Sequence, residues 1–461
     1  MSLRIFTALL TVAALAAGAS AADLEVGTGR QFSRIEDALA KARPGDTILV
    51  YPLADGKAYS KPAVMVRTAG LTIRSAKAGA RVKLDGSGYD YSGVGPTPRA
   101  IFQFDPGADG CILDGFELFN AHNDSANGAG VRINQANDVT IRNCTIRDND
   151  MGIMSNGELS AASGANQRIE FCTIHSNGNA KRAGYNHNLY LGGTSVTLHG
   201  CEVYASLTGH NVKSRAHFNW IEYCYIHDSA NREFDLVDDK GNTEAAGSHS
   251  VLLGNLIVKA ADMKGNKTVV HFGQDGGNDH KGAVYLVHNT IVTPYLSAVV
   301  HLSAPSARAE LVANIICGKG NQQTLADATN RADIRNVSAS GNWIGAGFSL
   351  PAGAAAGNVI GGRNEQPAFA DAKAGDYHPR RSGPKGIIGG APGLDKIKLP
   401  PLPKGKAAAT RPATRPATTP ATSASTHPAG RIETLREYSL KPPLPLRKDA
   451  ATVGAFDPAT E

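Results

Sequence analysis

The chain has 461 residues, of which 47 are Lys or Arg and 41 are Asp or Glu, and its formal net charge is +6 at pH 7. Residues 399–450 hold nine of the cations and three of the acids, so this stretch accounts for the whole excess. The net charge therefore does not show that the folded body binds polyanions. The six cysteines contain no Cys-x-x-Cys pair, which argues against a structural zinc site.

The first 21 residues have the pattern of a signal peptide. Arg4 precedes an apolar run from Ile5 to Ala17, and Ala19-Ser20-Ala21 is a small-residue cleavage signal. The run is short for a bilayer span, and no other segment is apolar enough to cross one. We therefore expect a secreted or periplasmic protein without a membrane span.

A short helix is expected near the start of the mature chain. Ser33 and Glu36 have the spacing of a capping box, in which each side chain bonds a backbone N–H of the first turn. Ile35, Ala38 and Leu39 follow at helical spacing and form an apolar stripe.

The middle of the chain repeats one strand–bend–strand unit. Its versions are VTIRNCTIRDN (139–149), RIEFCTIHSN (168–177), VTLHGCEVYAS (196–206), WIEYCYIHDS (220–229), VLLGNLIVKA (251–260), VYLVHNTIVT (284–293) and LVANIICGK (311–319). Their apolar residues alternate with a period of two, which excludes an all-helical solenoid. A variable period around a constant core predicts a β-solenoid that tolerates insertions at its corners.

The bend of each unit carries a cysteine or an asparagine. These residues are Cys144, Cys172, Cys201, Cys224, Asn255, Asn289 and Asn314, separated by 23 to 34 residues. Disulfides are permitted in an oxidising compartment, but this spacing favours stacking of the cysteines inside the fold. Asparagine suits such bends because it accepts the left-handed conformation and its amides can stack from coil to coil.

A further strand follows each unit. These strands are GIMSN (152–156), NLYLG (188–192), NVKSR (211–215), EFDLV (233–237), VVHFG (269–273) and VVHLS (299–303). Alternation predicts that Ile153, Leu189, Val212, Phe234, Val270 and Val300 point inward. It predicts an exposed outward column of Met154, Tyr190, Lys213, Asp235, His271 and His301, in which His301 is assigned no role.

Other polar residues flank this column. His187 and His210 take equivalent places before their strands, Arg232 is next in line, and Arg215 lies two residues beyond Lys213. Such a set of cations and rings is typical of a site for an anionic ligand. The alternative is a solvated strand face on which Lys213 and Asp235 form a cross-strand ion pair of small value.

These repeats resemble the right-handed parallel β-helix of the pectate-lyase-like superfamily, over residues 22–398. The resemblance implies an all-β fold, with an N-terminal entry and capping helix at residues 24–52, a closing segment at 376–392 and a last strand at 453–458. The Pro/Ala/Thr-rich residues 399–430 cannot pack a core, and we expect them to be flexible. The segment 431–461 is expected to return to the end of the β-helix.

The segment NVKSRAHFNWIEYCYI also resembles the lysine-bearing coil of chondroitinase-B and alginate-lyase-type enzymes. This resemblance implies β-elimination on a uronate polymer, with Lys213 as base and Arg232 as acid. The chemistry needs a cation at the C6 carboxylate, a base for the C5 proton and an acid at the leaving oxygen. Our catalytic candidates are Lys213, His210, Tyr190 and Arg232, and our substrate-binding candidates are His187, Arg215, Asp235 and His271.

No cofactor or metal is expected, because arginine or protonated histidine can neutralise the carboxylate. Calcium is not supported by a clear ligand set, since Ser206, Leu207 and Thr208 stand where those enzymes carry acidic ligands. We expect an acidic polysaccharide as partner, no nucleic acid, and a monomer.

Three alternatives remain open. A polygalacturonase-like hydrolase would use Asp235, Asp238 and Asp239 beside Gly209-His210, but in that family the aspartates precede the Gly-His motif. A mannuronan C5-epimerase would share the proton abstraction, but its Asp-Pro-His-Asp motif is absent. The protein could also be a non-catalytic glycan-binding solenoid.

Overall fold

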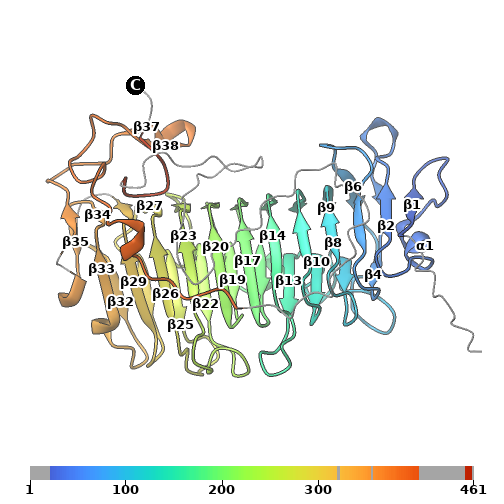
Figure 1. The fold of residues 1–461 in the computed structure, drawn as a ribbon, viewed down its shortest axis with the longest axis horizontal. Coiled ribbons are helices and arrows are strands. Elements are labelled where there is room, and N and C mark those ends of the chain that lie inside the picture. Colours follow the sequence, from blue (N-terminus) through green and yellow to red (C-terminus); the bar gives the residue numbers. More distant parts are fainter. Residues whose placement is uncertain (1–20, 319–321, 355–356, 404–451, 459–461) are drawn as a thin grey trace, which may run out of the picture.

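Short strands with alternating apolar residues wind into an elongated solenoid in the computed structural model (Figure 1). The structure describes residues 21–318, 322–354, 357–403 and 452–458. Residues 1–20 of the predicted signal peptide and most of the Pro/Ala/Thr-rich segment lie outside these residues. In the part of the chain that is described, no helix is long and apolar enough to cross a membrane.

Three long parallel sheets form the wall of the solenoid. The first sheet has twelve strands in the order β1 (Asp23–Val26), β2 (Thr47–Val50), β5 (Thr72–Ser75), β8 (Ile112–Asp114), β11 (Thr140–Arg142), β14 (Gln167–Glu170), β17 (Ser195–His199), β20 (Phe218–Glu222), β23 (Ser250–Leu253), β26 (Ala283–Val287), β29 (Arg308–Val312) and β33 (Val337–Ser340). The second sheet, also of twelve, is β3 (Tyr59–Ser60), β6 (Val82–Asp85), β9 (Phe116–Phe119), β12 (Thr145–Arg147), β15 (Thr173–His175), β18 (Glu202–Tyr204), β21 (Tyr225–His227), β24 (Leu256–Val258), β27 (Thr290–Val292), β30 (Ile315–Cys317), β34 (Trp343–Ile344) and β36 (Val359–Ile360).

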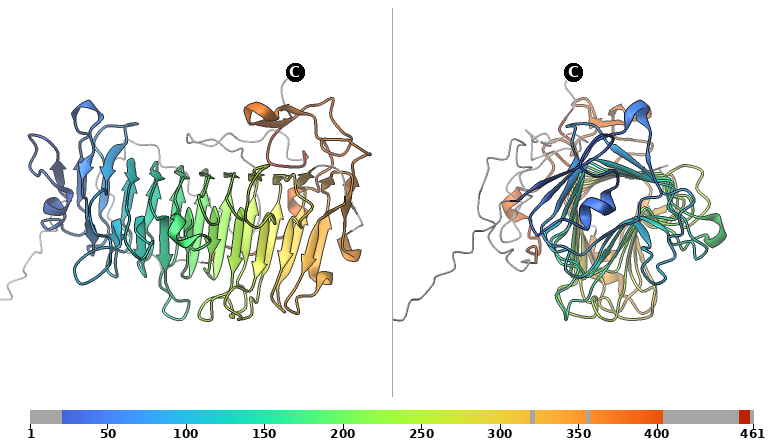
Figure 2. Two further views of the ribbon diagram at one scale, coloured as in Figure 1. Left: turned by 180° about the vertical axis from the view of Figure 1, so that it is seen from behind. Right: turned by 90° about the vertical axis from the view of Figure 1, so that its right-hand side faces the viewer.

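The third sheet carries the candidate site. Its ten strands are β4 (Val64–Val66), β7 (Ala100–Phe104), β10 (Ala129–Asn134), β13 (Met151–Asn156), β16 (Leu189–Leu191), β19 (Val212–Ser214), β22 (Phe234–Val237), β25 (Val270–Gly273), β28 (Val300–Leu302) and β32 (Ala326–Ala328). Each coil in the middle of the solenoid contributes one strand to each sheet, and the three sheets surround one apolar core (Figure 2). The predicted parallel β-helix is confirmed in its all-β, parallel-stranded character.

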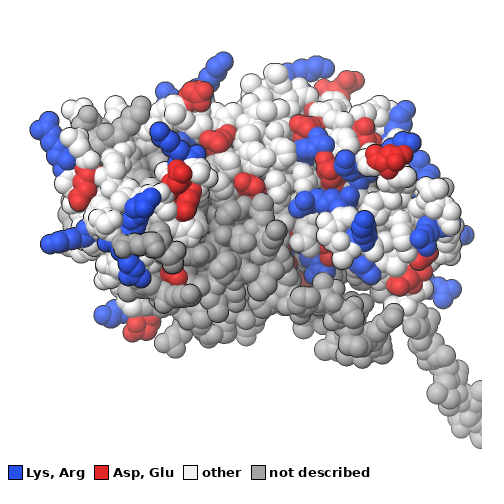
Figure 3. All heavy atoms as spheres, turned by 90° about the horizontal axis from the view of Figure 1, so that it is seen from above, with Lys and Arg blue, Asp and Glu red and all other residues white. Residues whose placement is uncertain are grey.

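Smaller elements complete the described chain. Parallel β31 (Gln323–Thr324) and β35 (Phe348–Ser349) form one small sheet, and antiparallel β37 (Phe369–Asp371) and β38 (Asp376–Pro379) form another. The 3-10 helices are η1 (Ala54–Gly56), η2 (Ala180–Arg182), η3 (Ile334–Asn336), η4 (Ala352–Ala354), η5 (Ala372–Ala374) and η6 (Leu394–Lys396). On the face seen in Figure 3, acidic and basic side chains are mixed toward both ends of the rod.

Helix α1 (Ile35–Leu39) packs against β1, β2 and β4 at the N-terminal end of the solenoid. Ile35 and Ala38 are buried there, as the apolar stripe predicts. The predicted capping box is wrong: the N-cap residue is Arg34, and it makes no side-chain cap. Glu36 instead accepts a hydrogen bond from the backbone N–H of Ala63 (2.7 Å), because the chain of the first coil passes beside the helix.

The bends between the first two sheets contain the predicted ladder. Amides stack from Asn255 to Asn289 and from Asn289 to Asn314, with each Nδ2 donating to the next Oδ1 at 3.0 Å. All six cysteines are buried and free, so no disulfide joins the coils. Because each amide also donates to a backbone carbonyl of the preceding coil, the ladder satisfies polar atoms that would otherwise be buried without partners.

The expectation that the ladder asparagines adopt the left-handed conformation is wrong. The residue one position earlier has positive φ in each bend: Asn143, Phe171, Gly200, Tyr223, Gly254, His288, Ala313 and Gly341. The reversal of the chain is made at this earlier residue, which leaves the following cysteine or asparagine to point into the core and stack.

The end of the described chain folds back on the outside of the solenoid. Ile397 and Leu399 pack on an apolar patch of the first sheet that includes Trp220. Among residues 452–458, Gly454 donates its N–H to the carbonyl of Ala313 (2.8 Å), and Phe456 packs in a cluster with Leu256. The predicted last strand at 453–458 is wrong, because this stretch has irregular backbone.

Candidate functional site

The outward column of the third sheet has the predicted register. Tyr190 pairs with Lys213, Lys213 with Asp235, and Asp235 with His271, on four consecutive strands. His301 follows in the same column. The residues predicted to point inward are all fully buried, as the period of two requires.

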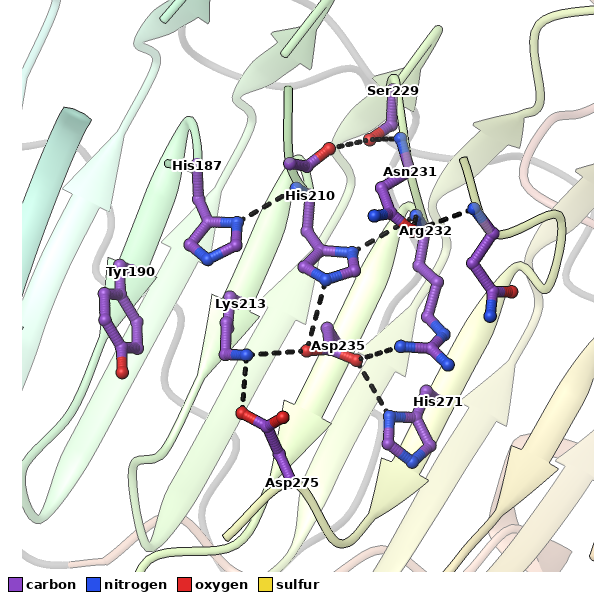
Figure 4. A network of polar contacts seen from close by, with 12 residues as sticks. His187, Tyr190, His210, Lys213, Ser229, Asn231, Arg232, Asp235, His271 and Asp275 are labelled. Atoms are coloured by element: carbon purple, nitrogen blue, oxygen red, sulfur yellow. Dashed lines mark hydrogen bonds and ion pairs between the residues drawn. The ribbon is translucent and has the colours of Figure 1, made fainter. Parts of the chain in front are cut away.

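The predicted exposure of this column is wrong. Lys213 is 8% exposed, Asp235 2% and His271 4%, while Tyr190 is half-buried. These side chains leave the sheet on its outer side but pair with one another and with the loop that follows β25 (Figure 4). Mutual pairing removes them from water, which the repeat pattern alone does not reveal.

Asp235 is the centre of the cluster. Its Oδ1 atom accepts from Arg232 Nη1 (2.9 Å) and pairs with His271 Nδ1 (2.8 Å). Its Oδ2 atom lies 3.1 Å from Lys213 Nζ and 3.3 Å from His210 Nε2. Burial acts to raise the pKa of this carboxyl, but the surrounding histidines and lysine outweigh it and hold the pKa well below its usual value.

The two histidines before the strands are linked through the backbone. The N–H of His210 donates to His187 Nδ1 (3.0 Å), and the N–H of Arg232 donates to His210 Nδ1 (3.2 Å). A backbone N–H can only donate, so both Nδ1 atoms are acceptors and the ring protons are on Nε2. His210 Nε2 therefore donates to Asp235, and the two rings stack with centroids 5.0 Å apart.

These histidines are neutral at neutral pH. Burial lowers the pKa of His210 to about 4 and outweighs the opposing effect of Asp235. Burial, with His210 next to it, also holds the pKa of His187 well below its usual value. His271 has a pKa lowered by burial, and its Nε2 contacts Ser303 Oγ at 2.6 Å.

A second carboxylate reaches the cluster from the loop after β25. Asp275 Oδ2 accepts from Lys213 Nζ (2.7 Å) and from the guanidinium of Arg215. Arg215 Nε also donates to the phenol oxygen of Tyr190 (3.0 Å). The Asp275 side chain is 41% exposed, so this pairing lies at the solvent edge of the cluster.

Asp238 fixes the loop that carries Asp275. The Oδ1 atom of Asp238 accepts from the N–H of Gly276 (2.7 Å) and from the N–H of Asp275, and its Oδ2 atom accepts from the N–H of Asn278 (2.6 Å). These bonds outweigh burial and lower the pKa of Asp238. Asp238 is therefore a structural carboxylate that holds Asp275 over Lys213.

Lys213 is held as an ammonium ion in this arrangement. Burial acts to lower its pKa, but Asp235 and Asp275 outweigh it and the pKa is raised. The sequence predicted an anionic ligand that would balance the cations of this site. Asp235 and Asp275 supply part of that negative charge from the protein itself. Lys213 could act as a base only after one of these carboxylates withdraws.

The turn before β22 rests on a buried ion pair. Glu233 accepts from Asn211 Nδ2 (2.6 Å) and lies 3.8 Å from Lys259 Nζ, with both side chains inaccessible to solvent. Lys259 also donates to the carbonyl of Asn231 (2.5 Å). These contacts fix the turn from which Arg232 reaches Asp235.

The aspartates considered for a hydrolase do not form a pair of free carboxylates. Asp235 is ion-paired, Asp238 holds a loop, and Asp239 accepts from Asn242 (2.6 Å). Burial raises the pKa of Asp239. Among the described residues, no group of three or more His, Cys, Asp or Glu side chains is arranged to hold a metal ion.

All eight site residues predicted from the sequence lie in the cluster around Asp235 or contact it directly. Two further residues of the cluster, Asp275 and Ser303, were not predicted. Asp275 lies in a coil-corner insertion, 62 residues after Lys213, where the repeat gives no register. Ser303 could have been found, because it ends the sixth strand segment that the repeat defines. No motif or repeat register predicts the loop that covers Lys213.

Solved structures of several polysaccharide-active enzymes resemble this fold. Pectate lyase Pel9A is 14% identical, with a TM-score of 0.53, over 83% of this chain and 95% of that chain. A rhamnogalacturonan lyase is 11% identical (TM-score 0.42, 78% and 93% covered), and an alginate lyase from Paenibacillus sp. str. FPU-7 is 15% identical (TM-score 0.39, 74% and 98% covered).

The likeness to pectate lyase Pel9A shows a shared fold, and the predicted resemblance to pectate-lyase-like β-helix proteins is confirmed at that level. The chain is a parallel β-helix protein with a buried polar cluster on the outer side of one sheet. No family model matches the chain, and no curated protein matches it.

Proposed function

We propose that the protein is a polysaccharide lyase that cleaves a uronate-containing polymer by β-elimination. The observation that carries this proposal is the position of Asp275. A solvent-facing carboxylate already lies against Lys213 Nζ and the Arg215 guanidinium, next to the Tyr190 phenol. A uronate carboxylate has the same charge and shape, so it can take the place of Asp275 on these two cations.

The proposed roles follow from this exchange. Arg215 binds the substrate carboxylate through Nη2, the atom that holds Asp275, and stabilises the charge that develops as the C5 proton leaves. Lys213, released from Asp275, is the proton-abstracting base. Tyr190, whose oxygen already accepts from Arg215, is the proton donor to the leaving O4.

The other predicted site residues then act through Asp235. His210, His271 and Arg232 hold its carboxylate in one orientation, and that carboxylate fixes Lys213. We therefore assign these three residues, first predicted as catalytic or substrate-binding groups, to positioning. Figure 4 shows the His187 ring beside His210, and because His187 is 2% exposed we assign it to positioning of His210 as well.

A substrate screen tests the proposal directly. The protein is incubated with alginate, pectate, glucuronan and glycosaminoglycans, and the products are assayed for unsaturated uronate ends and for reducing ends. A lyase gives both in equal number. Reducing ends without unsaturation would indicate a hydrolase and overturn the proposal, and a changed sugar configuration without chain cleavage would indicate an epimerase.

A second candidate is a non-catalytic polyuronate-binding solenoid. It is favoured by the pairing of Lys213 with two carboxylates, which keeps the amine protonated. This candidate predicts saturable binding of one of the same polymers without any product. Calorimetry on the polymers of the screen, with product analysis of the same samples, separates the two candidates.

We also propose that the protein is exported and acts outside the cytoplasm as a monomer, with α1 closing the N-terminal end of a right-handed coil. Export is supported by the signal-peptide pattern of residues 1–21. The position of α1 against β1, β2 and β4 supports the capping role. Cell fractionation and N-terminal sequencing of the mature protein test export, and sedimentation tests the monomer.

A further inference from the structure

Arg132 occupies the same outward column as Lys213, three strands earlier. It pairs in register with Met154, Met154 with Tyr190, and Tyr190 with Lys213. Neighbouring strands of a sheet are about 4.8 Å apart, so the two cations are separated by roughly 14 Å along the solenoid. A polymer lying along this sheet past Lys213 would also pass Arg132.

Arg132 has no carboxylate partner among the described residues. Its Nε donates to Asn134 Oδ1 (2.8 Å), and one Nη approaches the sulfur of Met154 (3.5 Å). The nearest acid in this network, Asp105, is reached only through the amide of Asn134 (3.0 Å) and is itself paired with Arg67 (3.1 Å). The guanidinium therefore retains donors and a charge that the protein does not neutralise.

Two arginines on strands of the other long sheets differ in this respect. Arg142 pairs with Asp114 (2.8 Å), and Arg147 pairs with Glu117 (2.6 Å). The environment of Arg132 disfavours its charge, since burial and the nearby cation of Arg99 lower its pKa. A half-buried guanidinium beside another cation is stabilised when an anion binds there.

The loop before β16 carries an exposed aromatic ring. The Tyr185 side chain in this loop is 43% exposed. The guanidinium of Arg182 lies 5.6 Å from the centroid of the Tyr185 ring. Exposed aromatic rings and free donors are the usual contacts of protein sites for sugars.

We propose that Arg132 binds a second carboxylate of the same polyuronate chain whose reacting sugar is at Lys213. This inference rests on the substrate class of the proposed function and adds a remote subsite to it. Met154 and Tyr190, which lie between the two cations, give the intervening sugars an apolar and aromatic floor. The subsite makes the protein selective for chains long enough to span both positions.

The test uses oligouronates of increasing length and the full chain. Binding is measured by calorimetry for the wild-type protein, Arg132→Gln, Arg132→Lys and the control Arg81→Gln, which changes an exposed arginine bonded to a backbone carbonyl. We expect wild-type affinity to rise on the order of 10-fold at the length that first reaches Arg132, the value of one charge-assisted contact. Arg132→Gln should lose this rise, Arg132→Lys should keep part of it, and Arg81→Gln should keep all of it.

The outcomes separate the subsite from the chemistry. Equal affinities of the wild-type and Arg132→Gln proteins at every length would overturn the subsite and leave the lyase proposal intact. If Arg132→Gln loses the rise in affinity with length but the wild-type protein binds the oligomers without cleaving them, the subsite is supported and the lyase proposal is overturned. Carboxyl-reduced oligomers should show no rise in either protein, and a rise with them would also overturn the subsite. A destabilised Arg132→Gln protein is recognised by its melting temperature, and the Arg132→Lys protein then carries the comparison.

Discussion

Lys213 and Asp235 lie opposite each other on adjacent strands, and the Lys213 Nζ atom bridges the buried Asp235 carboxylate (3.1 Å) and the exposed Asp275 carboxylate (2.7 Å). The two carboxylates belong to different parts of the molecule. Asp235 is fixed in the sheet wall, whereas Asp275 is carried on a loop. Lys213 thus has one permanent partner and one that can be exchanged, and the two should respond differently to mutation.

Replacing Asp235 by asparagine should strongly destabilise the fold. The change leaves the buried Lys213 and the half-buried Arg232 without their common anion, and breaking a buried ion pair costs about 3–5 kcal/mol. Chemical denaturation measures the loss. The matched control is Asp327→Asn, which breaks a pair with His301 at a carboxylate 51% exposed and should cost under about 1 kcal/mol. Equal losses in the two variants would contradict the central role of Asp235.

Replacing Asp275 by asparagine should change the pH dependence of activity and leave stability almost unchanged. Its side chain is 41% exposed, so the loss of stability should stay under about 1 kcal/mol. Asp275 acts to raise the pKa of Lys213, and its removal therefore lowers that pKa. If Lys213 is the base, the rise of kcat/KM with pH moves to lower pH in the variant. An unmoved profile would exclude Lys213 as the titrating base.

Two replacements of Lys213 separate its charge from its proton chemistry. Lys213→Ala removes both, and product formation measured at the unsaturated-uronate absorbance should be abolished. Lys213→Arg retains a cation against Asp235 and Asp275 but cannot release a proton near neutral pH. It should bind polyuronate and still lose on the order of 10²-fold or more in rate. Full activity of either variant would remove Lys213 from the mechanism.

Stability should fall as the pH drops from about 6.5 to about 4. The pKa of His210 is near 6.5 in the unfolded chain and about 4 in the folded one, so the unfolded chain binds more protons in this window. The stabilisation is complete above pH 6.5 and is lost as the pH falls toward the folded value, at about 3 kcal/mol for this one group. Denaturation of the wild-type and His210→Gln proteins at pH 7, 5.5 and 4 checks this. Between pH 7 and pH 4 the His210→Gln protein should lose less unfolding free energy than the wild type. An equal loss in the two proteins would contradict the prediction.

The repeat pattern predicted the wall of the solenoid well, because its information is local and periodic. Side chains alternate between the two faces of a strand, and this alternation is enough to assign Val212 inward and Lys213 outward. The coils stack, so equivalent residues of neighbouring strands then pair in register. The same reasoning placed Tyr190, Asp235 and His271 beside Lys213. Burial of the cluster could not be predicted, since it depends on the side chains that the column itself brings together.

What the pattern missed lies outside the repeat or at its margin. Asp275 belongs to a corner insertion, whose conformation is set by bonds to Asp238 and not by stacking. Arg132 belongs to the strand AGVRIN, just before the first repeat unit that the sequence shows clearly. The sequence does not show which side chains surround Arg132, so its lack of a carboxylate partner could not be predicted. The predicted capping box of α1 was wrong for a related reason. Glu36 accepts a hydrogen bond from the first coil and not from its own helix.

The change from cysteine to asparagine along the bend ladder has a practical consequence for the study of this rod. Four thiols mark successive bends from Cys144 to Cys224, whereas amides occupy the bends from Asn255 onward. Coils of a solenoid contact only their neighbours, so opening can begin at one end and spread. Burial raises the pKa of Cys144, Cys172 and Cys201, and in the closed rod these thiols are unreactive. The rod thus contains its own row of chemical reporters in its middle coils, whose order of alkylation would record the direction in which the coils unwind.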